Sequence, residues 1–429
     1  MFSIVATETS LMTFIIIPGI GFSQDNLYIL QLVVGYIIGR VLSSYILLPS
    51  YYNSNFISIY ELIGKSFGIS VQKLSSVIFL FTRLLADGIR FLVTAYIIAE
   101  IVSLPFVYCI FIVGIITMIY SSLGGVKAII NIDTIQFFIY IVGGISVIIF
   151  ILFFSNAYDG SISSVFSDFF NKDFLKLSMA PITSESYNIG SYNTSDGYYI
   201  INALFGGVLM SFCSHGIDYM MVQRALCAKN LKSAQKAMIG SGIIVFIQFI
   251  LFLFIGHLLI DLYDPNEDSN KVFSKFIIEE MPIGIKGLLV AGVLSAAMST
   301  LSSSINSLSS STIIDLKIKS NHRNKTYLAI FWCLVLMLFA LFFPYDKESS
   351  LYDTVLGIVS FTYGPLLSLF ILAKFKKKFS SFSVFLGVLS GILSVMISYS
   401  NGVAFTLFIL IGFSVNIVVV FLINAIEKK

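Results

Sequence analysis

The sequence predicts an all-α polytopic membrane protein with about twelve transmembrane helices. Its 429 residues are 57% hydrophobic and only 11% charged, and the mean hydropathy is +0.94. Soluble proteins carry about 25% charged residues, so a lipid bilayer is the expected surrounding. The predicted spans are apolar and separated by polar connections. They cover residues 1–20, 26–49, 72–103, 105–122, 131–155, 197–226, 237–262, 286–313, 326–344, 351–374, 381–399 and 403–426.

The basic residues of the connections predict the orientation. If both chain ends lie inside, the inside connections and tail carry seventeen Lys and Arg residues, and the outside connections carry six. Basic residues concentrate on the cytoplasmic side of membrane proteins. We therefore expect a multi-pass protein of the cell (inner) membrane with a cytoplasmic C-terminus. The net charge of +3 adds little, because placement matters more than the sum. No nucleic-acid partner is expected.

The absence of certain sequence motifs argues against several classes of activity. The four cysteines, Cys109, Cys213, Cys227 and Cys333, have no paired spacing, so buried free thiols are expected. Neither a Cys/His metal spacing nor a nucleotide-binding P-loop is found, which argues against an ATP-driven pump within this chain. A membrane enzyme that uses His215 and Asp218 is an alternative, although Asp218 could instead cap a helix or pair with Arg224. The sequence thus predicts that the protein is not an enzyme.

The first segment, MFSIVATETSLMTFIIIPG, is polar in its middle. Glu8 is costly inside a membrane unless it faces a cavity or a partner. Pro18-Gly19 is expected to end or break the helix. Interrupted helices near the bilayer midplane are where secondary transporters place ions and substrates.

The third segment carries Arg83, Asp87 and Arg90. Arg83 and Asp87 are four residues apart, and Asp87 and Arg90 are three apart, so one carboxylate can pair with two guanidinium groups on a helix. One interpretation is a structural ion cluster that ties helices together. The other is a clamp for a carboxylate or phosphate, because Arg suits planar anions.

Three further positions each allow a structural and a functional interpretation. Gly124-Gly125 predicts a tight turn, after which Asp133 opens the fifth helix either as a cap or as an ion- or proton-handling acid. In the sixth segment the run around Ser214-His215 is polar for a plain span. His215 is either a structural group or a proton carrier or substrate contact.

The eighth segment contains a serine-rich stretch from Ser295 to Thr312. Ala296, Ser299, Thr300 and Ser303 follow i, i+3, i+4, i+7 spacing and share one helix face. Neutral oxygens on one face suit a small hard cation. Small residues also allow close helix packing, so the spacing leaves both uses open.

These stretches together resemble the sodium:solute symporter family. The motifs that carry the resemblance are VATETSLMTFIIIPG, RLLADGIR, GGVKAIINIDTIQ, SHGIDYMMVQRAL and LSAAMSTLSSSINSLSSSTIIDL. The resemblance implies the leucine-transporter fold, with two inverted repeats of five helices. These repeats would cover residues 1–155 and 197–374, and two additional helices would cover 381–426. It also implies a monomer that uses sodium to import a small organic solute by alternating access.

The resemblance assigns ligands to the coupling ion, Na⁺. The family's conserved sodium site corresponds to backbone and hydroxyl oxygens of two helices. A second site, found in part of the family, uses an acid and further serines. The first site falls on Ala6, Thr9, Ala296, Ser299 and Thr300, and the second on Asp133, Ser302 and Ser303.

Substrate positions follow less directly from the resemblance. The candidates are Thr13, Gln31, Arg83, Ser214 and His215. Ser214-His215 stands in place of the aromatic pattern of the sugar transporters, and the arginines favour an anionic or amphoteric solute. Full-length members begin with an additional helix, which implies an N-terminally truncated member. Alternatives are a transport-inactive sensor or receptor on the same fold and a non-functional fragment.

Overall fold

The computed structural model describes residues 1–9, 11–23, 27–52, 58–154, 162–174, 195–319, 321–343, 351–375 and 379–427. Over these residues the chain forms helices and no β-strand, which confirms the all-α prediction. The helices are α1 (Phe2–Glu8), α2 (Leu11–Ser23), α3 (Ile29–Ile46), α4 (Leu48–Tyr52), α5 (Tyr60–Phe67), α6 (Ile69–Val102), α7 (Phe106–Phe154), α8 (Ile162–Phe170), α9 (Ile200–Gly216), α10 (Tyr219–Leu226), α11 (Leu231–Leu259), α12 (Val272–Glu279), α13 (Ile283–Asp315), α14 (His322–Phe342), α15 (Leu351–Leu372), α16 (Ser381–Ser400) and α17 (Phe405–Ile426).

The long apolar helices agree with the predicted spans. Eight described helices are long and apolar enough to cross a membrane alone, and the count rises to eleven if three bent pairs each form one span. The pairs are α1 with α2, α6 with the first part of α7, and α9 with α10. The grouping of α6 with residues 106–119 accounts for the difference from twelve, because the sequence predicts these as separate spans.

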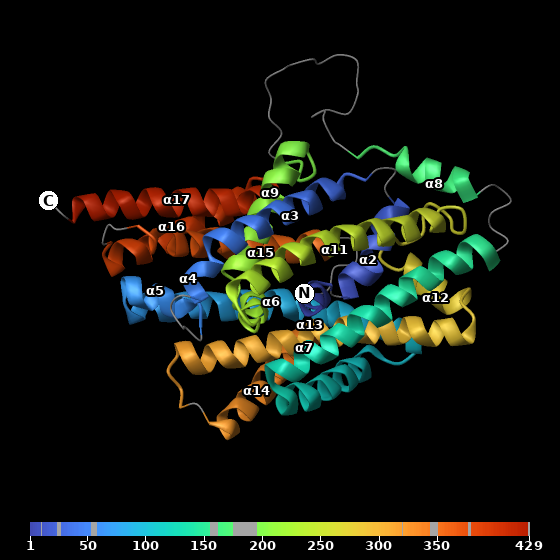
Figure 1. Ribbon diagram of the computed structural model, residues 1–429, viewed down its shortest axis with the longest axis horizontal. Helices are drawn as coiled ribbons and strands as arrows, with labels where there is room; N and C mark the ends of the chain where they lie inside the picture. Colours follow the sequence, from blue (N-terminus) through green and yellow to red (C-terminus); the bar gives the residue numbers. More distant parts are fainter. Residues whose placement is uncertain are drawn as a thin grey trace, which may run out of the picture.

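Helix α7 contains the fourth and fifth predicted segments in one run of helical backbone. The backbone therefore stays helical through Gly124-Gly125, where the sequence predicts a tight turn between two spans. Figure 1 shows that the run is not one straight rod, because its two teal arms meet at an angle. The two apolar arms are Phe106–Ile119 and Ile129–Phe154, on either side of residues 120–128.

The first segment breaks earlier than predicted. Helix α1 ends at Glu8, and α2 continues through Pro18 as far as Ser23, so the predicted break at Pro18-Gly19 is wrong. Gly256 of α11 lies so close that a Cβ there would come within 2.0 Å of the Pro18 carbonyl oxygen. Proline cannot donate a backbone hydrogen bond inside a helix, and the close packing against α11 stabilises α2 in spite of this loss. The bend between α1 and α2 instead follows the polar residues Thr7, Glu8 and Thr9.

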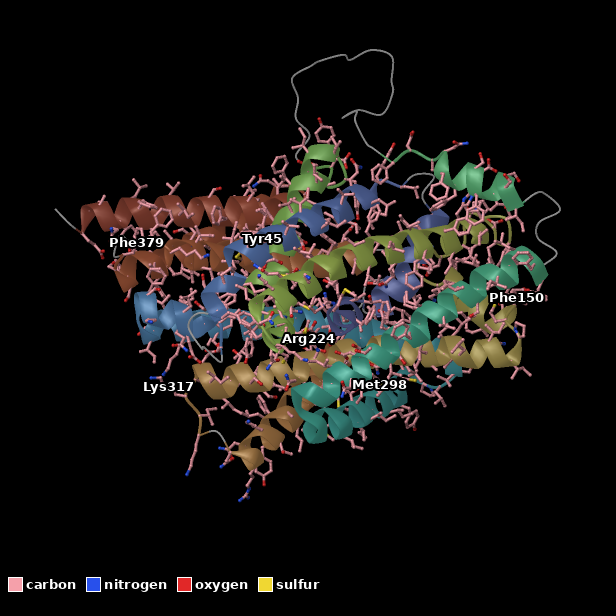
Figure 2. The ribbon with its side chains drawn as sticks, in the orientation of Figure 1. Tyr45, Phe150, Arg224, Met298, Lys317 and Phe379 are labelled. Carbon is pink, nitrogen blue, oxygen red and sulfur yellow. The ribbon has the colours of Figure 1, made fainter. Side chains whose placement is uncertain are left out.

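The serine-rich helix α13 is the central element. It packs against α1, α2, α6, α7, α10, α12 and α14, and Figure 1 shows it running through the middle of the helical bundle. Figure 2 labels Met298, part-way along α13, and Lys317, beyond one end of this helix. The hydroxyl side chains of α13 are therefore enclosed by protein, where each needs a hydrogen-bond partner.

The cysteine prediction holds for three of four residues. Cys109, Cys213 and Cys333 are buried free thiols, whereas Cys227 is exposed just after the end of α10. Cys227 lies at the start of the polar connection that follows α10, outside the apolar interior.

Candidate functional site

The break between α1 and α2 lies against α13. The two helices are bent by 63° relative to each other. The Thr300 hydroxyl of α13 lies 3.3 Å from the carbonyl oxygen of Thr7 and 3.4 Å from that of Ala296. The Thr9 hydroxyl donates a 3.0 Å hydrogen bond to Gln248 of α11. The C-terminal end of a helix presents carbonyl oxygens and a partial negative charge, so this break is suited to a cation.

The residues predicted for the first sodium ion are all buried. Ala6, Thr9, Ala296, Ser299 and Thr300 are each no more than 2% exposed. Thr300 faces the α1 carbonyls, as the prediction requires. Ser299 instead donates a 2.7 Å hydrogen bond to the carboxylate of Asp133 on α7. The donor set consists of neutral oxygens beside one acid, which fits a small hard cation such as Na⁺.

Asp133 is enclosed and richly hydrogen bonded. It lies inside α7, so its interpretation as a helix cap is wrong. The side chain accepts hydrogen bonds from Ser3 at 2.8 Å, Thr7 at 3.3 Å and Ser299 at 2.7 Å. It thus joins α1, α7 and α13 at the break in the first segment.

Arg224 of α10 also reaches this acid. Its guanidinium lies 3.3 Å from the Asp133 carboxylate and donates to the Ser303 hydroxyl. Ser302 and Ser303 donate to the Ser299 carbonyl, at 3.1 and 2.6 Å. Two of the three residues predicted for a second sodium ion, Asp133 and Ser303, therefore already contact the positively charged guanidinium of Arg224. The sequence suggested Asp218 as the partner of Arg224 and did not indicate this contact.

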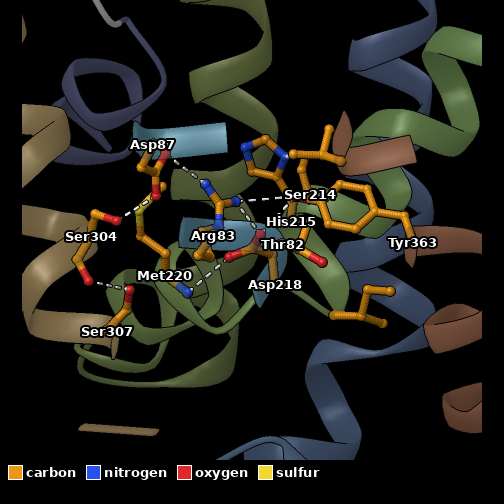
Figure 3. A network of polar contacts seen from close by, with 12 residues as sticks. Thr82, Arg83, Asp87, Ser214, His215, Asp218, Met220, Ser304, Ser307 and Tyr363 are labelled. Carbon is orange, nitrogen blue, oxygen red and sulfur yellow. Dashed lines mark hydrogen bonds and ion pairs between the residues drawn. The ribbon is translucent and has the colours of Figure 1, made fainter. Parts of the chain in front are cut away.

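A second charged network surrounds Arg83 (Figure 3). Arg83 pairs with Asp218 and lies 3.4 Å from Asp87, and Arg90 lies 2.6 Å from Asp87. This confirms the pairing predicted from the three- and four-residue spacing. The Tyr363 hydroxyl donates to Asp218 at 2.6 Å, and Ser304 donates to Asp87.

Asp218 has two roles in this network. Its carboxylate accepts a 3.0 Å hydrogen bond from the Met220 backbone N–H and so caps the start of α10. The same side chain pairs with Arg83. The predicted cap is confirmed, but the acid that pairs with Arg224 is Asp133 rather than Asp218.

A central cavity lies between the two networks. Of the five predicted substrate residues, Thr13, Arg83 and Ser214 line it, together with Glu8, Tyr36, Arg90, Ser211 and Tyr352. His215 lies directly behind Ser214, with its Nδ1 atom 2.8 Å from the Ser214 hydroxyl. Gln31 does not line the cavity, because its amide nitrogen donates to the backbone carbonyls of Tyr28 and Tyr198.

Glu8 is the acidic group on the cavity wall. Its side chain is 22% exposed and pairs with Arg40 of α3, which is fully buried. The His215 Nε2 atom lies 3.7 Å from the Glu8 carboxylate, on the same side. Glu8 therefore has both the cavity and the charged partner that an acid within a membrane span requires.

The family can now be assigned. The sequence pattern of the sodium:solute symporter family matches residues 1–391. The chain belongs to this family. It is therefore a sodium-coupled solute symporter and not an enzyme, and Na⁺ is its coupling ion.

Individual relatives agree with this assignment. The symporter is 25% identical over 411 residues to the sodium/sialic acid symporter NanT of Aliivibrio fischeri, which covers 92% of this chain and 78% of that protein. It is 25% identical over 434 residues to the sodium/sialic acid symporter SiaT of Proteus mirabilis, with 97% and 84% covered. The sodium/glucose cotransporter 4 of Danio rerio is 24% identical, and 58% of that longer protein is covered.

Solved structures show the same fold. A substrate-bound, outward-open sodium-coupled sialic acid symporter has a TM-score of 0.82 and 23% identity, with 99% of this chain and 89% of that chain covered. The nucleobase–cation symporter Mhp1 has a TM-score of 0.58 and 13% identity, with 100% and 92% covered. This symporter therefore has the leucine-transporter type of fold that the sequence predicts.

Proposed function

We propose that the symporter imports a small hydroxylated solute that carries a carboxylate, in the class of acidic sugars. The observation that supports this most is the pair of arginines on the cavity wall. Arg83 is engaged by Asp218, Asp87 and Tyr363. Arg90 pairs with Asp87, but its side chain is 20% exposed, so it is the better placed of the two to bind an anion.

Polar groups on the remaining wall suit the rest of such a solute. Thr13, Ser211 and Ser214 offer hydroxyls, and the Glu8 carboxylate accepts hydrogen bonds. Hydroxyl and carboxylate groups are common partners of sugar hydroxyls. The sialic acid symporters among the relatives are named for a solute that carries both a carboxylate and hydroxyls.

The charge balance also favours an anionic solute. Arg40 pairs with Glu8, Arg224 pairs with Asp133, and Arg83 and Arg90 pair with Asp87 and Asp218. These eight groups sum to zero net charge. Because each bound sodium ion adds one positive charge to a low-dielectric interior, a negative solute would offset it. Sodium and solute would then favour the same state, which is the requirement for coupling.

We place the coupling ion at the break in the first segment. Ala6, Thr9, Ala296, Ser299 and Thr300 would hold it, and Asp133, Ser302 and Ser303 would hold a second ion. Arg224 contacts Asp133 and Ser303, so the second ion and this guanidinium would be alternative occupants. Each ion would contribute about 2.3 kcal/mol at a potential of about −100 mV.

The proposed cycle is alternating access between the two sides of the membrane. The repeats, residues 1–155 and 197–374, would rock around the central cavity while 381–426 stay outside the moving parts. We further propose that the protein works as a monomer in the cell (inner) membrane with its C-terminus in the cytoplasm. The distribution of basic residues supports that orientation.

Uptake into proteoliposomes tests the proposal. The full chain should accumulate radiolabelled sialic acid when an inward sodium gradient is present, and not when choline replaces sodium. Arg90→Gln should lower this uptake at least about tenfold, since a charged hydrogen-bonded contact contributes about 1.5–3 kcal/mol. Arg323→Gln is the matched control, because Arg323 is exposed and contacts Tyr327 at the surface. Sodium-driven uptake of glucose but not of any carboxylate would contradict the solute class.

A further inference from the structure

Asp315, the last residue of α13, differs from the other buried aspartates. Asp87, Asp133, Asp218 and Asp315 are each no more than 1% exposed. The first three pair with arginines. Within the part of the chain that the structure describes, no Lys, Arg or His forms an ion pair with Asp315. A buried carboxylate without a countercharge is costly, and a bound cation would supply that charge.

Neutral hydrogen-bond donors converge on this carboxylate from three segments of the chain. The Ser311 hydroxyl of α13 donates at 2.8 Å and the Ser58 hydroxyl, just before α5, at 3.0 Å. The Gln72 amide of α6 donates at 3.0 Å to the other carboxylate oxygen. Ser76 of α6 lies 2.8 Å from the Ser311 hydroxyl. Hydroxyls both donate and accept, so they can turn their lone pairs to a metal ion.

A row of hydroxyls joins this cluster to the proposed sodium site. Ser299, Ser303, Ser307, Ser311 and Asp315 follow one another every four residues along α13. All five are 0% exposed. At 1.5 Å per residue they cover about 24 Å of helix, from the break in the first segment to the end that carries Lys317. Figure 3 shows Ser304 and Ser307 of the same helix beside the Arg83 network.

We propose that the Asp315 carboxylate and the hydroxyls of Ser311, Ser76 and Ser58 form a second-stage site for sodium, which the ion occupies after it leaves the core of the protein. Gln72 holds the carboxylate in place through its amide N–H. This inference rests on the proposed function, because it assumes that sodium departs along α13. The ligands are one carboxylate and neutral oxygens, a set that suits a hard monovalent cation. Ser58 covers the carboxylate from the α5 side, so the ion would exchange with solvent when this segment moves.

Sodium-dependent thermal unfolding of the full chain tests the site. Sodium chloride is titrated against choline chloride at constant ionic strength, first in a Ser299→Ala/Thr300→Ala background that removes the core site. We expect a residual rise in Tm of about 2 °C at about 300 mM sodium, because a ligand that binds only the folded state stabilises it. Adding Asp315→Asn should abolish that rise. Adding Ser309→Ala should leave it, because Ser309 donates only to its own Ile305 carbonyl.

Three outcomes would overturn the site. They are the absence of a residual rise in the background variant, a rise that survives Asp315→Asn, and an Asp315→Asn effect that is equal in sodium and choline. The last result would mean that Asp315 only accepts the hydrogen bond of Ser58 and stabilises the fold without binding sodium. If the triple variant does not fold, Ser311→Ala should reduce the rise by about half. If the background variant keeps the full wild-type rise in Tm and Asp315→Asn abolishes it, the core sodium site alone is refuted.

Discussion

Two of the three bent helix pairs, α1 with α2 and α9 with α10, satisfy the backbone carbonyls at their breaks in different ways. The bends are similar, 63° between α1 and α2 and 61° between α9 and α10. At the first break the Thr7 carbonyl accepts a 3.3 Å hydrogen bond from a threonine hydroxyl. At the second, the carbonyls of Gly216 and Ile217 accept hydrogen bonds from Tyr51 at 2.5 Å and Tyr60 at 3.2 Å.

The difference lies in how firmly those carbonyls are held. Thr300 is part of α13 and can turn its hydroxyl toward another partner without moving the helix. Tyr51 and Tyr60 have buried rings on α4 and α5, so they can leave only if those helices move. We therefore expect the first break to bind a cation, and we expect the second, held by the clamp of Tyr51 and Tyr60, to open only with α4 and α5. Four predictions test this contrast.

The largest effect is expected at the first break. Thr300→Val removes the hydroxyl and keeps the shape, so sodium-dependent uptake should fall at least about tenfold, toward the level without sodium. Uptake measured against sodium concentration checks this. Thr134→Val is the control, because Thr134 donates to its own Ile130 carbonyl. Wild-type sodium affinity in Thr300→Val would refute the core sodium site.

A large loss of stability is expected at the second break. Asp218→Asn removes the charge that holds Arg83 and weakens the cap of α10, which should cost about 3 kcal/mol of unfolding free energy. Thermal unfolding measures this loss. The exposed Asp264, changed to Asn, should cost less than about 0.5 kcal/mol. Equal losses in the two variants would mean that the second break does not depend on its acid.

A smaller effect concerns the guanidinium beside Asp133. If Arg224 and sodium compete for Asp133 and Ser303, Arg224→Gln should raise the apparent sodium affinity about tenfold, or about 1.4 kcal/mol. Asp133→Asn should lower the sodium Hill coefficient of uptake toward one. Lys236→Gln, on the surface of α11, is the control for a general loss of charge. A wild-type Hill coefficient of one that neither variant changes would remove the second ion.

The smallest effect should appear at the tyrosine clamp. Tyr51→Phe and Tyr60→Phe each delete one hydroxyl and one hydrogen bond to a buried carbonyl, which should cost about 1 kcal/mol. Each variant should therefore unfold at a lower temperature than the wild type. Tyr45→Phe should not differ, because Tyr45 is 63% exposed. No change in all three variants would show that the second break is held by packing alone.

Local spacing predicted part of this site. The distances of three and four residues identified the Arg83–Asp87–Arg90 cluster, because one helix turn fixes which side chains meet. Helical periodicity also placed Ser299, Thr300 and Ser303 on one face. The apolar segments predicted the all-α membrane fold, since spans must be long and continuous.

Other features depended on contacts between distant segments. Arg224 belongs to a polar stretch, and only the packing of α10 against α13 brings it to Asp133. Gln31 was placed at the cavity by resemblance, but it hydrogen bonds to backbone carbonyls instead. Pro18 suggested a break, yet the close approach of Gly256 allows the helix to continue. Such contacts have no signature in the spacing of nearby residues.

The exposed thiol of Cys227 gives experimental access to the tyrosine clamp. Tyr52 of α4 donates to the carbonyls of Ala225 and Ala228, on either side of this cysteine, at 2.9 and 3.2 Å. The other three cysteines are buried. A maleimide fluorophore or spin label should therefore attach mainly to Cys227 in the unaltered chain. Its signal would report when α4 separates from the end of α10, without any engineered cysteine.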